Sequence, residues 1–149
     1  MPRRKELNTI LFVIVLGFIC MYVFIILHIK LQESAQKVLV QTYNIYKTLE
    51  VLVLILFGSL IEYRKVILTF KSGIQLNSYY LIFAIGLIVL LVLPFEIIIK
   101  LGPAHPGSVK GIISFVLTNM SLRSVLSVLA GILTVRSLVS CENQMKFME

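Results

Sequence analysis

Residues 9–29 read TILFVIVLGFICMYVFIILHI, which is 21 consecutive residues without a charged side chain. As an α-helix this stretch would be about 31 Å long, and the hydrocarbon core of a bilayer is about 30 Å thick. The stretch therefore predicts a membrane-spanning helix. Basic residues precede it, as in a secretory signal, but it is longer than a usual signal core and no small-residue cleavage site follows, so we expect an uncleaved first helix.

Three further apolar segments follow, and the predicted spans are about 9–29, 43–62, 79–99 and 111–135. Hydrophobic residues make up 58% of the chain and the mean hydropathy is +0.97, which is more apolar surface than a water-soluble fold of 149 residues could bury. The expected fold class is all-α: an integral membrane bundle of four transmembrane helices that forms a single domain, 1–149.

The segment between the first two spans carries an amphipathic pattern over about 34–48, with Ala35, Leu39, Tyr43, Tyr46 and Leu49 at helical spacing. It predicts an extended second helix that runs without a break from about 34 to 69.

Two short loops have recognisable helix-terminating or helix-capping residues. Gly73 is suited to end the second helix, and Asn77 or Ser78 to cap the third, which meets Pro94 near its far end. The turn at 102–108 contains His105, which we interpret as a solvated loop residue.

The composition excludes most soluble catalytic and binding functions. The chain has no Asp, and its two His and two Cys are too few and too far apart for a metal site or a disulfide framework. It lacks a glycine-rich phosphate loop and the common hydrolase motifs. We therefore expect no enzyme activity, no cofactor and no metal.

The net charge of +7 lies mainly at the ends of the spans, where it meets anionic lipid, so no nucleic-acid partner is needed to explain it. With a cytoplasmic N-terminus, the inner side carries eight basic residues: Arg3, Arg4, Lys5, Arg64, Lys65, Lys71, Arg136 and Lys146. The outer side carries five: Lys30, Lys37, Lys47, Lys100 and Lys110. This bias predicts a multi-pass protein of the plasma (inner) membrane with both termini in the cytoplasm.

Arg123 lies about 12 residues into the fourth predicted span, where an unpaired charge costs several kcal/mol. One face of that helix is polar or small and is expected to face the bundle interior. Its members are Asn119, Arg123, Ser127, Ala130, Thr134 and Ser137.

The second helix presents a matching surface of Lys47, Glu50, Gly58, Glu62 and Lys65. We predict that Glu50 pairs with Arg123, with Glu62 as the second candidate. The predicted charge cluster is thus Arg123, Glu50, Glu62 and Asn119, with Lys47 and Glu96 as secondary members.

The loop Phe70-Lys71-Ser72-Gly73-Ile74-Gln75-Leu76, followed by Tyr80 and a third apolar helix, resembles the PsiE family of phosphate-starvation-inducible membrane proteins over about 60 residues. The acids Glu62 and Glu96 stand where that family carries similar ones. The resemblance implies a small four-helix inner-membrane protein in a stress response, without a defined activity. The family pattern also has an Arg in the third helix, where this chain has Leu91.

Two functions fit the intramembrane charges. The leading one is an ion-conducting or transport-linked role, which four short helices could support in a homo-oligomer with polar faces on its axis. The alternative is a non-conducting accessory or scaffold subunit whose charges fasten its own helices or recognise a membrane partner protein.

Overall fold

The protein is all-helical over the residues described by a computed structural model, which are 4–72, 76–94, 96–97 and 109–138. The helices are α1 (Arg4–Gln36), α2 (Val40–Ile61), α3 (Tyr63–Ser72), α4 (Ser78–Val92), α6 (Val109–Thr118) and α7 (Met120–Ser137). Within the described residues, three helical segments are long and apolar enough to cross a membrane: Asn8–Gln36 within α1, Val40–Ile61 and Met120–Ser137.

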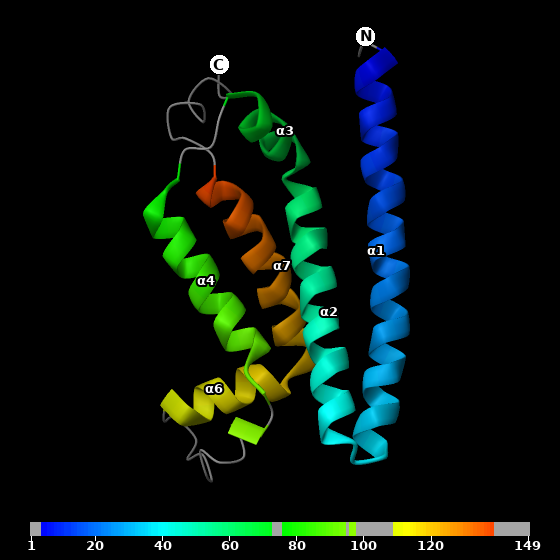
Figure 1. Ribbon diagram of the computed structural model, residues 1–149, viewed down its shortest axis with the longest axis vertical. Coiled ribbons are helices and arrows are strands. Elements are labelled where there is room, and N and C mark those ends of the chain that lie inside the picture. Colours follow the sequence, from blue (N-terminus) through cyan, green and yellow to red (C-terminus); the bar gives the residue numbers. More distant parts are fainter. Residues whose placement is uncertain (1–3, 73–75, 95, 98–108, 139–149) are drawn as a thin grey trace.

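The long helices α1, α2 and α7 run roughly alongside one another, with α2 between the other two (Figure 1). The short helix α4 packs on α7, and α6 lies across one end of the arrangement. The buried core lies where α2, α4 and α7 meet and contains Val51, Leu91 and Ala130. By contrast, α1 contacts α2 and leaves most of its large apolar side chains exposed, as a lipid-facing helix would.

The predicted unbroken helix over 34–69 is wrong, because the chain reverses at Lys37–Leu39. Residues 34–36 complete α1, and Val38 adopts a left-handed conformation with φ of 55°. The backbone N–H of Leu39 then donates to the carbonyl of Ser34 (3.1 Å), which closes the helix end. A second break falls at Glu62, the C-cap of α2. The amphipathic segment 34–48 is therefore divided between two helices.

The third predicted span, 79–99, is also interrupted. Asn77 caps α4 as predicted, and its side chain accepts a hydrogen bond from the backbone N–H of Tyr79 (3.2 Å). The helix ends at Val92 because Pro94 forces Leu93 out of the helical conformation (φ −48°, ψ 127°). At 15 residues, α4 is about 22 Å long, which is shorter than a hydrocarbon core.

The fourth predicted span, 111–135, consists of two helices that meet at Asn119. Its backbone is extended (φ −78°, ψ 109°), and its side chain accepts from the backbone N–H of Leu122, so it is the N-cap of α7. Arg123 is consequently the fourth residue of α7 rather than the middle of a long helix. Gly73 and His105 lie outside the described residues.

Candidate functional site

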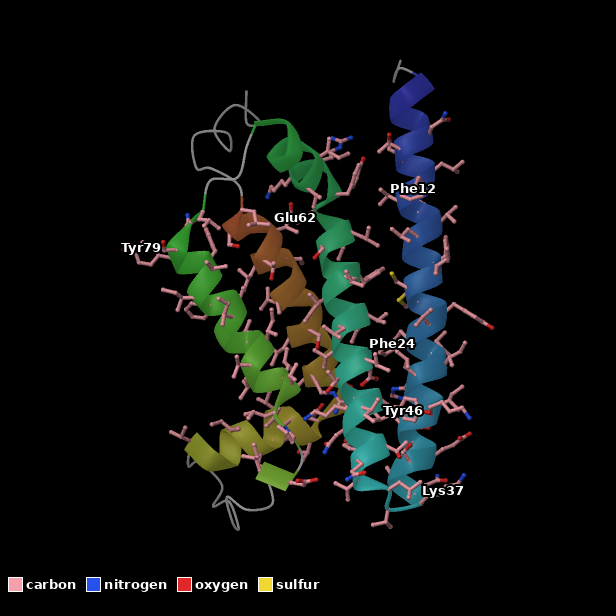
Figure 2. All side chains as sticks on the ribbon, in the orientation of Figure 1. Phe12, Phe24, Lys37, Tyr46, Glu62 and Tyr79 are labelled. Atoms are coloured by element: carbon pink, nitrogen blue, oxygen red, sulfur yellow. The ribbon has the colours of Figure 1, made fainter. Side chains whose placement is uncertain are left out.

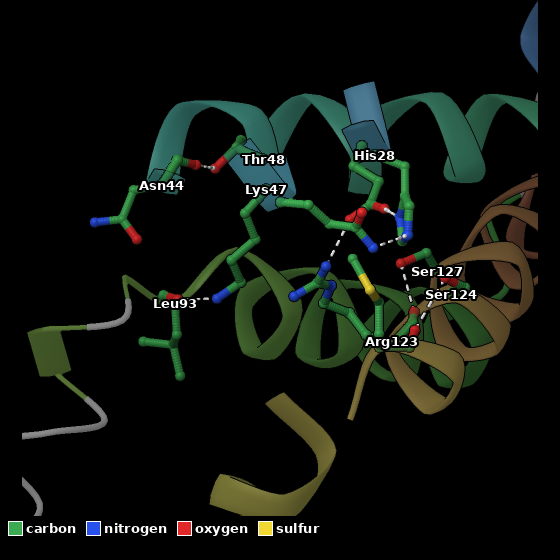
Figure 3. A network of polar contacts seen from close by, with 11 residues as sticks. His28, Asn44, Lys47, Thr48, Leu93, Arg123, Ser124 and Ser127 are labelled. Carbon is green, nitrogen blue, oxygen red and sulfur yellow. Dashed lines mark hydrogen bonds and ion pairs between the residues drawn. The ribbon is translucent and has the colours of Figure 1, made fainter. Parts of the chain in front are cut away.

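The predicted pair of Arg123 and Glu50 is present at the interface between α2 and α7. Nη2 of Arg123 lies 2.6 Å from Oε2 of Glu50 (Figure 3). Both residues are buried, with 2% of Arg123 and 0% of Glu50 exposed. The guanidinium and the carboxylate thus neutralise each other away from solvent, which makes their separate removal costly.

His28 of α1 completes the cluster, and the sequence did not single it out. Its Nδ1 lies 3.0 Å from Oε1 of Glu50, so the carboxylate is contacted through both oxygens. On the other side of the ring, Nε2 of His28 lies 3.2 Å from Nε2 of Gln32. Because a carboxylate only accepts and an amide N–H only donates, these contacts fit a neutral imidazole that donates from Nδ1. An ionisable residue within the apolar stretch 9–29 was the available signal for this position.

The side chain of His28 is 29% exposed, whereas that of Glu50 is 1% exposed. The cluster therefore has one edge at the surface of the bundle and its centre in the interior. In Figure 3 the imidazole of His28 on α1 and the guanidinium of Arg123 on α7 both approach the carboxylate carried by α2. One carboxylate on α2 consequently joins three helices.

Lys47, a secondary member of the predicted cluster, is buried (2% exposed) but does not join the Arg123–Glu50 pair. Its Nζ donates to the backbone carbonyl of Leu93 at 2.6 Å (Figure 3). This carbonyl belongs to the C-cap of α4, where the helix leaves acceptors without an intrahelical partner. Lys47 therefore ties α2 to the end of α4 that Pro94 interrupts.

The polar face of α7 points inward as predicted for Arg123, Ser127, Ala130 and Ser137, which are all buried. Its hydroxyl groups are satisfied locally. Ser127 Oγ donates to the carbonyl of Arg123 (2.7 Å) and Ser137 Oγ to that of Thr134 (2.7 Å). This face thus packs helices together and offers few polar atoms to a ligand.

Glu62, the second predicted partner of Arg123, lies at the other end of α2 and makes different contacts. Its Oε1 is 2.8 Å from Nη2 of Arg136, and its Oε2 is 2.9 Å from Nζ of Lys65. Burial alone would raise the pKa of the Glu62 carboxyl, but the hydrogen bonds from Lys65 and Arg136 outweigh burial and lower that pKa below its ordinary value. The prediction that Glu62 shares a cluster with Arg123 is wrong.

The remaining predicted members do not reach the pair through their side chains. Asn119 uses its side chain to cap α7, and Glu96 is exposed beyond the end of α4. Within the described residues, no group of three or more His, Cys, Asp or Glu could hold a metal ion.

A close helix crossing lies between the two charged ends of the α2–α7 interface. Cβ atoms added to Gly58 and Gly131 would collide with the backbone carbonyls of Val128 and Ile55, respectively. The two backbones therefore touch there, as small residues permit in membrane helices. This contact separates Glu50 from Glu62, which are about 18 Å apart along the axis of α2.

No family model, curated protein or solved structure matches this chain. The resemblance to the PsiE family consequently stays a prediction from the loop residues.

Proposed function

We propose that this chain is an integral membrane protein that serves as a non-conducting accessory subunit, with its buried charges acting as fasteners between its own helices. The observation that supports this function most is the state of Glu50. Its two oxygens contact His28 and Arg123, and none of the residue is exposed. Because both of its oxygens are already engaged, this carboxylate can hardly coordinate a passing cation in place of the water molecules that the cation would lose.

The helix crossing supports the same proposal. A conducting path along the α2–α7 interface would have to pass Gly58 and Gly131, where the backbones are in contact. Interiors packed this closely leave no room for a file of water. The partner of an accessory subunit would be a second membrane protein, and the exposed apolar faces of α1 and α4 are available to its helices or to lipid.

For the orientation, we propose both termini in the cytoplasm of the plasma membrane, on the eight-to-five excess of basic residues. With Cys20 replaced by Ala, Cys141 should resist membrane-impermeant thiol reagents in intact cells and react after lysis. Labelling of Cys141 in intact cells would reverse this orientation.

Reconstitution into liposomes tests the non-conducting role. Purified protein, shown by flotation to be inserted, should carry no flux of protons, monovalent cations or anions above that of empty vesicles. Glu50→Gln should lower thermal stability and leave permeability unchanged. In membranes of the native cell, mild crosslinking should yield a defined adduct with another membrane protein. A selective flux abolished by Glu50→Gln would refute the proposal.

A second function, the transport-linked one, is favoured by the exposed edge of His28. The contacts from Gln32 through His28 to Glu50 join the surface to a buried carboxylate, and an imidazole can relay protons through its two ring nitrogens. Such a role would need a homo-oligomer with these edges on a common axis. It predicts a proton flux in the same liposomes that His28→Ala abolishes.

A further inference from the structure

An apolar groove separates α1 and α2 at the end of the molecule away from the Arg123–Glu50 pair. The two helices are joined by the tight turn at Lys37–Leu39, and the groove lies toward their other ends, because its α2 lining directly precedes Glu62, which Figure 2 labels. Its lining includes Val13, Gly17 and Met21 of α1 and Phe57, Leu60 and Ile61 of α2. Its volume of about 340 Å³ falls within the range of small-molecule sites, about 300–1,000 Å³.

Gly17 is what keeps this groove open on the α1 side. A Cβ at this position would meet Phe57 at 3.8 Å, an ordinary contact, so a larger side chain could enter the groove without a backbone collision. The groove is lined by apolar side chains of two apolar helices. A flexible hydrocarbon chain fits these surroundings better than any polar ligand.

Basic residues follow the groove-lining part of α2 along the chain. Arg64 follows Ile61 by three residues, so their Cα atoms are at most about 11 Å apart. Lys65 and Arg136 contact the single carboxylate of Glu62, which orients both of them. Arg136 belongs to α7, across α2 from the groove, whereas exposed Arg64 follows the groove-lining end of α2 directly. An exposed arginine suits a phosphate group, which it can bind through two N–H groups.

From the groove and the arginine that follows it together, we infer a binding site for one anionic phospholipid, with an acyl chain between α1 and α2 and its phosphate near Arg64. The inference rests on the proposed membrane location. The register fits a lipid, because Ile61 ends the apolar helix α2 and Phe57 lies about 6 Å deeper. Basic residues at span ends attract anionic headgroups, and an adjoining apolar groove makes the contact specific for a whole lipid.

Native mass spectrometry of the purified protein tests this site. The protein is equilibrated with phosphatidylglycerol or with phosphatidylcholine of identical acyl chains, and the retained lipid is counted per chain. One phosphatidylglycerol should be retained at least tenfold more strongly than phosphatidylcholine. Gly17→Leu should reduce retention of both lipids at least tenfold, because leucine fills the groove.

Matched variants separate the groove from general effects. Gly86 on α4 has no atom within 4 Å of a built Cβ, so Gly86→Leu adds the same side chain at an open site and should leave retention unchanged. Arg64→Gln should lower the preference for phosphatidylglycerol about fivefold, the effect of one cation near an anionic surface. The same change at exposed Lys37, at the opposite end, should have no effect.

Two results would overturn the inference: equal retention in the Gly17→Leu and Gly86→Leu variants, or no preference between the two lipids in the unaltered protein. A flotation assay distinguishes this failure from that of the proposed function. Protein that inserts into vesicles but retains no particular lipid refutes the lipid site alone. Protein that does not insert refutes the membrane location as well.

Discussion

Neutralising Glu50 and Arg123, singly and together, tests the central contact of the fold. Glu50→Gln leaves the guanidinium of Arg123 buried without its carboxylate, and breaking a buried pair in this way costs about 3–5 kcal/mol. Arg123→Gln leaves Glu50 with the contact to His28, so we expect a smaller loss of about 1–3 kcal/mol. The double variant places two neutral amides together, and its loss should be smaller than the sum by about 2 kcal/mol.

Unfolding in a mixed-detergent titration, followed by circular dichroism, measures the four free energies of this cycle. The control is the same cycle on Lys30 and Glu33, an exposed pair on one helix (3.0 Å), which should show almost no coupling. Losses that add to within about 0.5 kcal/mol for Glu50 and Arg123 would refute the reasoning. They would mean that the buried charges do not hold α2 against α7.

Three further predictions concern other contacts made by α2. Gly131→Ala should destabilise the protein by about 1–3 kcal/mol, because the added Cβ forces α7 away from α2. The control Gly86→Ala adds the same atom at an open site and should not destabilise it. Equal melting temperatures for the two variants would contradict the close helix crossing. Lys47→Met should cost about 1–3 kcal/mol in the same titration, because it leaves the part-buried carbonyl of Leu93 without its donor. Because the pKa of Glu62 is lower in the folded protein than its ordinary value of 4.5, the ionised carboxylate stabilises the fold at pH values above 4.5. This stability is lost as the pH falls through the lower pKa of the folded state. The melting temperature should therefore fall less on acidification in Glu62→Gln than in the unaltered protein.

The helical class and the apolar elements could be predicted from the sequence because length and hydropathy decide them. The breaks could not all be predicted. Pro94 was visible as a possible end, but Val38 reverses the chain in a left-handed conformation that β-branched residues rarely adopt, with neither Gly nor Pro as a signal. By its spacing Asn119 could belong to the polar face of one long helix or could cap a new one. Only the backbone and side-chain geometry in the structure identifies it as the N-cap of α7.

The Arg123–Glu50 pair was predictable because a charge in apolar surroundings needs a partner, and few carboxylates were available. The partners of Glu62 could not be predicted in the same way. Helical spacing places Glu50 and Glu62 on one face of α2, but their distances from α7 residues depend on where the helices cross. His28 was overlooked because it was weighed as a metal ligand rather than as a hydrogen-bond donor to a buried acid.

The break at Asn119 also explains why the carboxylate of Glu50 suits its position. The N-terminal turn of a helix carries partial positive charge from unpaired N–H groups, which favours an anion and disfavours a cation. Arg123 stands on the fourth residue of α7 and adds its own charge to that end. A carboxylate on the neighbouring helix therefore pairs with the guanidinium at the end of α7 that already carries partial positive charge. An acid at position 50 consequently contributes more to folding stability than an acid elsewhere on the same face of α2. Among the carboxylates described in this protein, neutralisation of Glu50 by Glu50→Gln should therefore lower the stability most.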